Sequence, residues 1–104
     1  MQVQIHTDNH IEGGVGLAQW ASTTIEAALA RFKGHVSRID AHLSDADAGK
    51  RSTPDSLQCM LDARLDGHPP QVVKSHAATM HQAVDGAIAK LVRQIDGTLE
   101  RARP

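Results

Sequence analysis

The sequence is poor in aromatic residues: its 104 positions include one Trp, one Phe and no Tyr. Aliphatic side chains must therefore form most of the core. Proteins that bind a single strand of RNA or DNA commonly stack its bases on aromatic side chains. The composition thus argues against an RRM-like, single-strand-binding protein.

Cysteine is represented by Cys59 alone, which excludes an intramolecular disulfide. No apolar run approaches the roughly 20 residues of a membrane-spanning helix. Residues 1–7 also lack the basic stretch and the following apolar run of a secretory signal. We therefore expect a cytoplasmic protein from a reducing compartment, without a membrane partner.

The formal net charge is only −1 with the histidines neutral, and a value near zero speaks at first against a nucleic-acid partner. The charges are unevenly distributed, however, and a local basic patch can contact phosphates while other surfaces stay acidic. Residues 27–39 and 86–95 contain no acid. Their basic residues are Arg31, Lys33 and Arg38 in the first segment, and Lys90 and Arg93 in the second.

Period-2 alternation of apolar residues predicts four strands, at residues 2–7, 38–43, 57–66 and 71–77. The third strand is the clearest, because its apolar odd-numbered residues alternate with mostly polar even-numbered ones. The pair Pro69 and Pro70 stands just before the fourth strand, which fits because proline cannot donate to a sheet ladder. Residues 45–54 are expected to form a polar loop.

Spacings of three and four between apolar residues predict two helices. The stripe of the first helix begins at Leu17 and ends at Phe32, with Gly34 as the expected C-terminal cap.

The second helix is expected to start after Thr79 as its N-cap and to carry its apolar stripe over residues 80–99. Gly86 and Gly97 each weaken this helix by about 1 kcal/mol relative to Ala. Gly97 is therefore expected to let the last turn fray.

These elements predict a single α+β domain over residues 1–104. It is a two-layer sandwich of order β-α-β-β-β-α, with two helices on one face of a four-stranded sheet. The arrangement resembles a double-stranded-RNA-binding domain, a likeness of fold that says little about function. The opposite sheet face should be exposed to water or to a partner. It would carry Arg38, His42, Gln58, Met60, Asp62 and Arg64.

Two segments resemble the hibernation promoting factor and ribosome-associated inhibitor family, also called sigma-54 modulation proteins. In the first, residues 28–39 (ALARFKGHVSRI), a helix end leads into a strand through an Arg-Ile pair. The second, residues 79–95 (TMHQAVDGAIAKLVRQI), resembles the family's acidic-Gly helix with its Lys-Leu-x-Arg-Gln core. Together with the strand pattern, the likeness covers nearly the whole chain.

The resemblance implies a non-catalytic, rRNA-binding protein with no cofactor and no small-molecule substrate. Members of the family lodge between head and body of the small ribosomal subunit, overlap the sites of messenger and transfer RNA, and inhibit or protect idle ribosomes under stress. By this resemblance, Arg38, Lys90 and Arg93 are expected to contact RNA. Weaker candidates are Arg31, Lys33, Lys74, Arg101 and Arg103.

The chain departs from the family pattern towards its C-terminal end. Typical members continue the last helix with several lysines, whereas residues 96–99 here are Asp-Gly-Thr-Leu, so we expect fewer phosphate contacts at this end. Because the sequence given ends at Pro104, we also expect the short form of the family, without the C-terminal dimerisation domain of the long forms. We expect a monomer, although the exposed sheet face offers a surface for self-association.

Three features suggest other chemistry, and each has a plainer explanation. The seven histidines are scattered without metal-ligand spacing, so surface positions are favoured over a zinc site. Cys59 lies on the apolar side of its strand, which favours a buried, inert thiol over a nucleophile. Residues 13–16 (GGVG) lack the ending of a phosphate-binding loop, so a flexible turn is favoured there.

The alternative function is a non-catalytic protein-interaction module that has kept this fold and lost ribosome binding. Its contact surface would be the exposed sheet face or Trp20, whose place at the edge of the helix stripe favours core packing over exposure. The salt dependence of binding distinguishes the two functions, because binding through phosphate contacts weakens steeply as the salt concentration rises. An apolar protein interface barely responds to salt.

Overall fold

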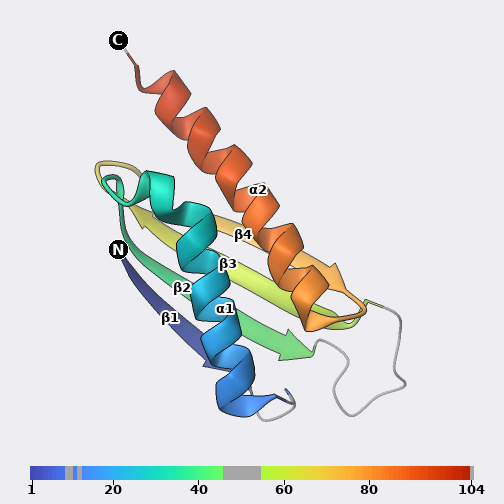
Figure 1. Ribbon diagram of the computed structural model, residues 1–104. Helices are drawn as coiled ribbons and strands as arrows, with labels where there is room; N and C mark the ends of the chain where they lie inside the picture. Colours follow the sequence, from blue (N-terminus) through green and yellow to red (C-terminus); the bar gives the residue numbers. More distant parts are fainter. Residues whose placement is uncertain (9–10, 12, 46–54, 104) are drawn as a thin grey trace.

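Strands and helices follow one another in the expected order in the computed structural model, which describes residues 1–8, 11, 13–45 and 55–103. In chain order the elements are β1 (Gln2–Thr7), α1 (Gly14–Leu29), the short 3-10 helix η1 (Ala30–Phe32), β2 (Val36–Asp45), β3 (Leu57–Leu65), β4 (Gln71–Ala77) and α2 (Met80–Arg101). The last turns of α2 extend beyond the sheet (Figure 1). Nearly all of the loop expected at residues 45–54 lies outside the described residues.

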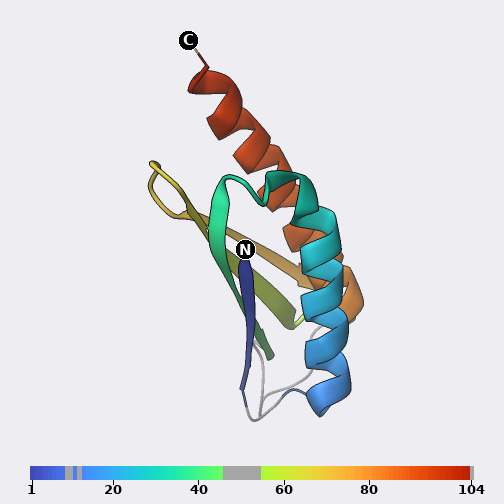
Figure 2. The same cartoon turned by 60° about the vertical axis from the view of Figure 1, so that its left-hand side comes forward.

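The strands form one mixed sheet in the order β1-β2-β3-β4. β1 runs parallel to β2, while β2 with β3 and β3 with β4 are antiparallel. Both helices lie on the same face of this sheet, as Figure 2 shows from the side. Helix α1 contacts β1 and helix α2 packs on β3 and β4. The two-layer α+β sandwich is therefore confirmed.

The opposite sheet face carries the side chains that the alternation assigns to it. In register across the sheet, Arg38 of β2 pairs with Arg64 of β3, and His42 pairs with Met60. Lys74 of β4 lies in register with Met60 on the other side of β3. Because side chains on directly opposed residues share a face, these residues line one surface. The expected composition of the open face is confirmed.

Aliphatic residues from both helices and from strands β2, β3 and β4 form most of the core. Ile25 and Leu29 of α1, Ile39 of β2, Leu61 of β3 and Leu91 of α2 are fully buried. Burial of each such side chain stabilises the fold by roughly 1.5–3 kcal/mol. Aliphatic side chains were expected to form most of this core, because the sequence has only one Trp, one Phe and no Tyr.

Helix α1 starts and ends earlier than the sequence pattern indicates. It begins at Gly14, not Leu17, because the left-handed backbone of Gly13 (φ 108°) turns the chain into the helix before the apolar stripe starts. The C-terminal cap expected at Gly34 is wrong, since the helix passes after Leu29 into the 3-10 turn η1. In this turn the Ala30 carbonyl accepts a 3.2 Å bond from the Lys33 amide and the Phe32 carbonyl a 2.8 Å bond from the His35 amide, so these two carbonyls are satisfied by 3-10-type bonds.

Helix α2 begins as expected and does not end early. The Thr79 hydroxyl accepts a 3.1 Å hydrogen bond from the Gln82 amide, which confirms the N-cap. The helix runs through Gly97 to Arg101, so the expected fraying at Gly97 is wrong. Thr98 donates from Oγ1 to the side-chain oxygen of the buried Gln71 at 3.2 Å, and this tertiary contact stabilises the last turns.

Candidate nucleic-acid interface

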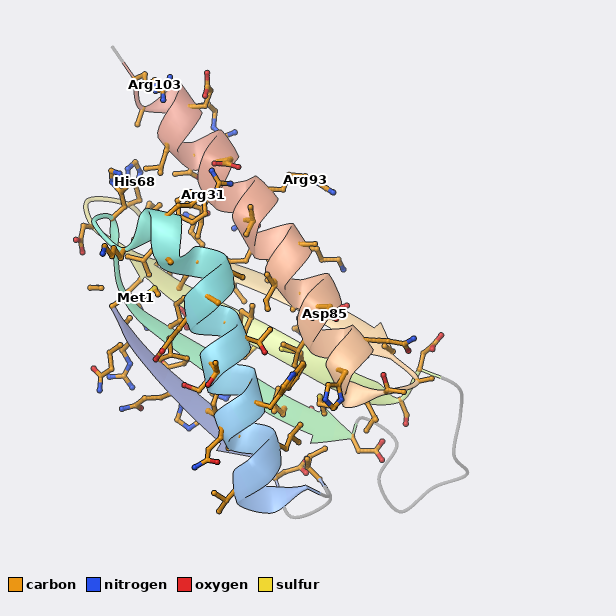
Figure 3. The ribbon with its side chains drawn as sticks, in the orientation of Figure 1. Met1, Arg31, His68, Asp85, Arg93 and Arg103 are labelled. Carbon is orange, nitrogen blue, oxygen red and sulfur yellow. The ribbon has the colours of Figure 1, made fainter. Side chains whose placement is uncertain are left out.

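Two of the predicted cations, Lys90 and Arg93, lie where helix α2 meets strand β4 at the edge of the sheet. Lys74 contributes its backbone carbonyl there, while its side chain belongs to the open sheet face. An open groove of about 400 Å³ runs between the two elements. Its lining residues are Val72, Val73, Lys74, Lys90, Arg93 and Gln94. Lys90 is held in place by a 2.7 Å hydrogen bond from its Nζ to the carbonyl oxygen of Lys74. Arg93 extends from the outer side of α2, away from the sheet (Figure 3).

The helical period places these cations over β4. Gly86 lies so close to β4 that a Cβ atom there would be 2.3 Å from the hydroxyl of Ser75. Lys90 stands one turn further along the same side of α2, and Arg93 stands roughly 60° away on a helix of 100° per residue. Leu91 is fully buried beside them. The sequence expectation that Lys90 and Arg93 lie outside the core stripe is confirmed.

Carboxylate pairing distinguishes Lys90 and Arg93 from two of the other predicted cations, Arg31 and Arg38. Arg31 of η1 forms a 2.6 Å ion pair with Asp96 of α2. Arg38 donates from Nε to Asp40 at 2.8 Å. Within the described part of the chain, by contrast, neither Lys90 nor Arg93 forms an ion pair with a carboxylate. Their charges are therefore available to an anionic partner.

Arg38 belongs to a different surface, the open face of the sheet. Its Nη2 donates to Asp40 at 3.0 Å and to the side-chain oxygen of Gln4 at 2.9 Å. The hydrogen bond from Arg38, followed by that from His6 at 2.9 Å, lowers the pKa of Asp40 to about 2. The same bond with Asp40 raises the pKa of Arg38 above its ordinary value. Arg38 thus lies in a neutralised network and is not brought together with Lys90 and Arg93.

The remaining candidates lie towards the far end of α2. Lys33 is exposed in the turn after η1. Arg101 approaches Thr98, with 3.5 Å between its Nη2 and the hydroxyl oxygen. Arg103 lines a hollow of about 380 Å³ together with His68, and both are labelled at this end of the molecule in Figure 3. These cations form no common groove with Lys90.

Gln94 and Val72 line the groove and were missed by sequence reasoning. Gln94 donates from its side-chain nitrogen to the side-chain oxygen of Gln71 at 2.8 Å, which ties the wall of the groove to the start of β4. The expected site residues were all cations, so no uncharged residue was among them. Spacing would have found Gln94, which stands four residues after Lys90 and therefore on the same side of the helix.

Trp20 has the half-buried position expected of a residue at the edge of the stripe. Its ring centroid is 3.9 Å from that of His81 on α2, and the two ring planes are tilted by 47°. Trp20, His81 and Met80 line a hollow of about 450 Å³ between the starts of the two helices. The indole therefore joins α1 to α2 and packs against the core.

The described residues give little support for a reactive cysteine, a metal site or a membrane-spanning helix. Cys59 is fully buried, and this burial raises the pKa of its thiol to about 12. No three His, Cys, Asp or Glu side chains within the described ranges lie close enough together to hold a metal ion. None of the helices described is both long and apolar enough to cross a membrane.

The arrangement of strands and helices is that of ribosomal subunit interface proteins. The structure of such a protein from Coxiella burnetii is similar with a TM-score of 0.70 and 14% identity, over 96% of this chain and 99% of that one. The N-terminal domain of Thermus thermophilus Protein Y is similar with a TM-score of 0.69 and 21% identity, over 91% and 96% of the two chains.

The family model described as sigma 54 modulation protein / S30EA ribosomal protein matches residues 3–103. The chain belongs to this family, as the two sequence blocks had indicated. Membership indicates a ribosome-associated protein. No curated protein matches the chain in sequence.

Proposed function

We propose that this chain is a non-catalytic factor that binds the small ribosomal subunit through its rRNA, in the cytoplasm, and inhibits or protects idle ribosomes under stress. The observation that carries the proposal is the groove between α2 and β4, which Lys90 and Arg93 line without a carboxylate partner among the described residues. Family membership supports the ribosome as the partner. The two similar structures, those of a ribosomal subunit interface protein and of Protein Y, agree with it.

The chemistry of the groove suits a phosphate backbone. An arginine guanidinium can donate two parallel hydrogen bonds to a phosphate, and a lysine ammonium supplies a compact positive charge. Lys90 and Arg93 project from neighbouring turns of one rigid helix, so a partner meets both charges in a fixed geometry. The scarcity of aromatic rings favours contacts with the backbone of folded RNA over stacking of unpaired bases.

The paired cations would contribute less. Arg38 must exchange its bonds with Asp40 for bonds to phosphate, and Arg31 must leave Asp96. A phosphate contact made in exchange for an existing ion pair gains only the difference between the two interactions. We therefore rank Lys90 and Arg93 above Arg31 and Arg38 as RNA-binding residues.

Co-sedimentation with purified small ribosomal subunits tests the proposal. The test variant is Lys90→Gln/Arg93→Gln, and the matched control is Arg31→Gln/Arg64→Gln. Both double variants lose two positive charges, but the cations of the control already have carboxylate partners, Asp96 and Asp62. We expect roughly a tenfold to a hundredfold loss of affinity in the test variant, with a salt dependence that is shallower by one to two phosphate contacts.

Three results would decide against the groove or the ribosome. Equal losses in both variants would mean that total charge matters and the groove does not. Binding that is insensitive to salt would favour the protein-interaction alternative. A folded wild-type chain that stays in the supernatant at low salt would remove the ribosomal subunit as the partner.

A further inference from the structure

The two edges of the sheet differ in how they are protected from pairing with another strand. At β4, Pro69 and Pro70 precede the strand, Lys74 lies within it, and the Nζ of Lys90 occupies a backbone carbonyl. Prolines, lysines and covering side chains are the usual means of blocking an edge strand. At the other edge, β1 (QVQIHT) contains no proline and no charged residue.

The outer side of β1 is unoccupied within the part of the chain that the structure describes. β1 pairs with β2 alone and is the first strand of the sheet. Helix α1 lies over its face and leaves its edge open (Figures 1 and 2). A strand with half of its backbone groups unpaired, alternating side chains and no charge is a template for another strand.

The flank of α1 above β1 is partly apolar and carries one charge, Glu26. Trp20 points towards α2, where its ring contacts that of His81. On a helix of 100° per residue, Val15, Ala18 and Ser22 project within about 40° of the direction opposite to Trp20. This flank lies above the free edge of β1, because α2 covers the other end of the sheet. Val15 is 73% exposed there.

Two exposed apolar residues lie along this edge, one near each end of β1. Among the described residues the exposed large hydrophobic side chains are Met1, Val15 and Val72, and the first two lie at β1 and on the flank of α1. The two elements contain a single Asp, Glu, Lys or Arg, which is Glu26. Two copies of this surface can therefore pack against each other without bringing like charges into direct opposition.

We infer that two copies of this chain associate through β1, as antiparallel strands related by a twofold axis, with the α1 flanks packed above them. Two registers keep the helices of both copies on the same side of the joined sheet, one with Gln4 on the axis and one with Ile5. A shift of one residue would move the apolar side chains to the wrong face. In the register with Gln4 on the axis, Val3 pairs with Ile5 and Gln2 pairs with His6 of the other copy.

This surface differs from the open sheet face that the sequence had suggested for self-association. It also lies at the edge opposite β4, so the groove of Lys90 and Arg93 stays accessible in both copies. The inference is therefore independent of the proposed RNA binding. Either one can fail while the other holds.

Sedimentation equilibrium over a range of concentrations tests the inference on the whole chain, whose monomer mass is 11.2 kDa. The test variant is Val15→Lys, and the matched control is Val72→Lys, which adds the same charge at an exposed apolar residue of the opposite edge. We expect the wild type and the control to approach twice the monomer mass. The test variant should raise the Kd of the dimer by roughly tenfold or more, because each copy buries an unpaired charge.

Hydrogen exchange of backbone amides supplies a second measurement that does not depend on a substitution. Outward-pointing amides of β1 should exchange more slowly as the concentration of the wild type rises. A wild type that remains monomeric at every concentration overturns the inference. So does an equal effect of both lysine variants, or concentration-dependent protection confined to β4.

Discussion

The ammonium group of Lys90 lies 2.7 Å from the backbone carbonyl oxygen of Lys74, so a cation of α2 is anchored on the edge strand of the sheet. This bond performs two tasks. It satisfies an edge carbonyl that would otherwise need water, and it fixes the lysine beside Arg93 in the groove. Stability and charge placement at this edge are thereby linked through one side chain.

Replacement of Lys90 by Ala should consequently affect stability and RNA affinity, whereas Arg93→Ala should affect affinity alone. The loss of the exposed Lys90 bond should lower the free energy of unfolding by about 0.5–1 kcal/mol. Arg93, which has no described side-chain partner, should change it by less than about 0.5 kcal/mol. Urea unfolding of both variants measures the difference, and equal stability losses would contradict the anchoring role.

Gly86→Ala should destabilise the protein even though alanine favours helix. The added Cβ would lie 2.3 Å from the Oγ and 3.3 Å from the Cβ of Ser75, so α2 or β4 must move. Overpacking of about 1–3 kcal/mol exceeds the gain of about 1 kcal/mol in helix propensity.

Ser75→Ala provides the control for this contact. In that background the closest atom is gone, and Gly86→Ala should cost about 1 kcal/mol less than in the wild type. Urea unfolding of the two single variants and the double variant gives the comparison. A stabilising Gly86→Ala in the wild-type background would show that the helix is not held this close to β4.

Asp40→Asn should remove a contribution to stability that depends on pH. The pKa of Asp40 is lowered in the fold from the ordinary 3.8 to about 2. The unfolded chain therefore binds a proton at higher pH than the folded one, so the contribution is complete above about pH 4 and disappears as the pH falls towards 2.

Thermal or urea unfolding between pH 2 and pH 6 checks this expectation. The gap in stability between the wild type and Asp40→Asn should be largest at the upper end and should shrink towards the lower end. Asp96→Asn, whose carboxylate forms the exposed pair with Arg31, serves as a comparison for a general charge effect. A gap that stays constant over this range would refute the assigned network.

Cys59 should be unreactive in the folded protein. Its thiol is fully buried, and burial raises its pKa to about 12, so almost no thiolate exists at neutral pH. Reaction with a thiol reagent should require unfolding and should accelerate with urea. Cys59→Ser should be less stable than Cys59→Ala by about 1–2 kcal/mol, because the hydroxyl enters an apolar core. Rapid labelling in the native state would contradict this burial.

Local pattern was sufficient for most of the fold. The period of two in residues 57–65 and the spacing of three and four after Thr79 both depend on neighbours along the chain, and both elements formed as expected. The errors occurred at helix ends. There, Gly13 started α1 early and the contact of Thr98 with Gln71 kept α2 intact past Gly97.

The candidate site could be found in part. Lys90 and Arg93 were expected from the resemblance of residues 79–95 to the family, and helical periodicity agrees because it places both outside the apolar stripe. Lys74 was ranked low, since nothing local indicates that β4 lies beside this turn of α2. Arg31 was ranked with it, although Asp96 neutralises it in the fold.

The sequence by itself determined the elements, their apolar faces and the order in which they follow one another, because periodicity and capping act between residues a few positions apart. Only the tertiary structure decided which charges remain available. Arg31 and Asp96 are 65 residues apart in the chain, and Lys90 and Lys74 are 16 apart. Whether such groups come into contact depends on how α2 packs on the sheet, which includes close approaches such as that of Gly86 to Ser75.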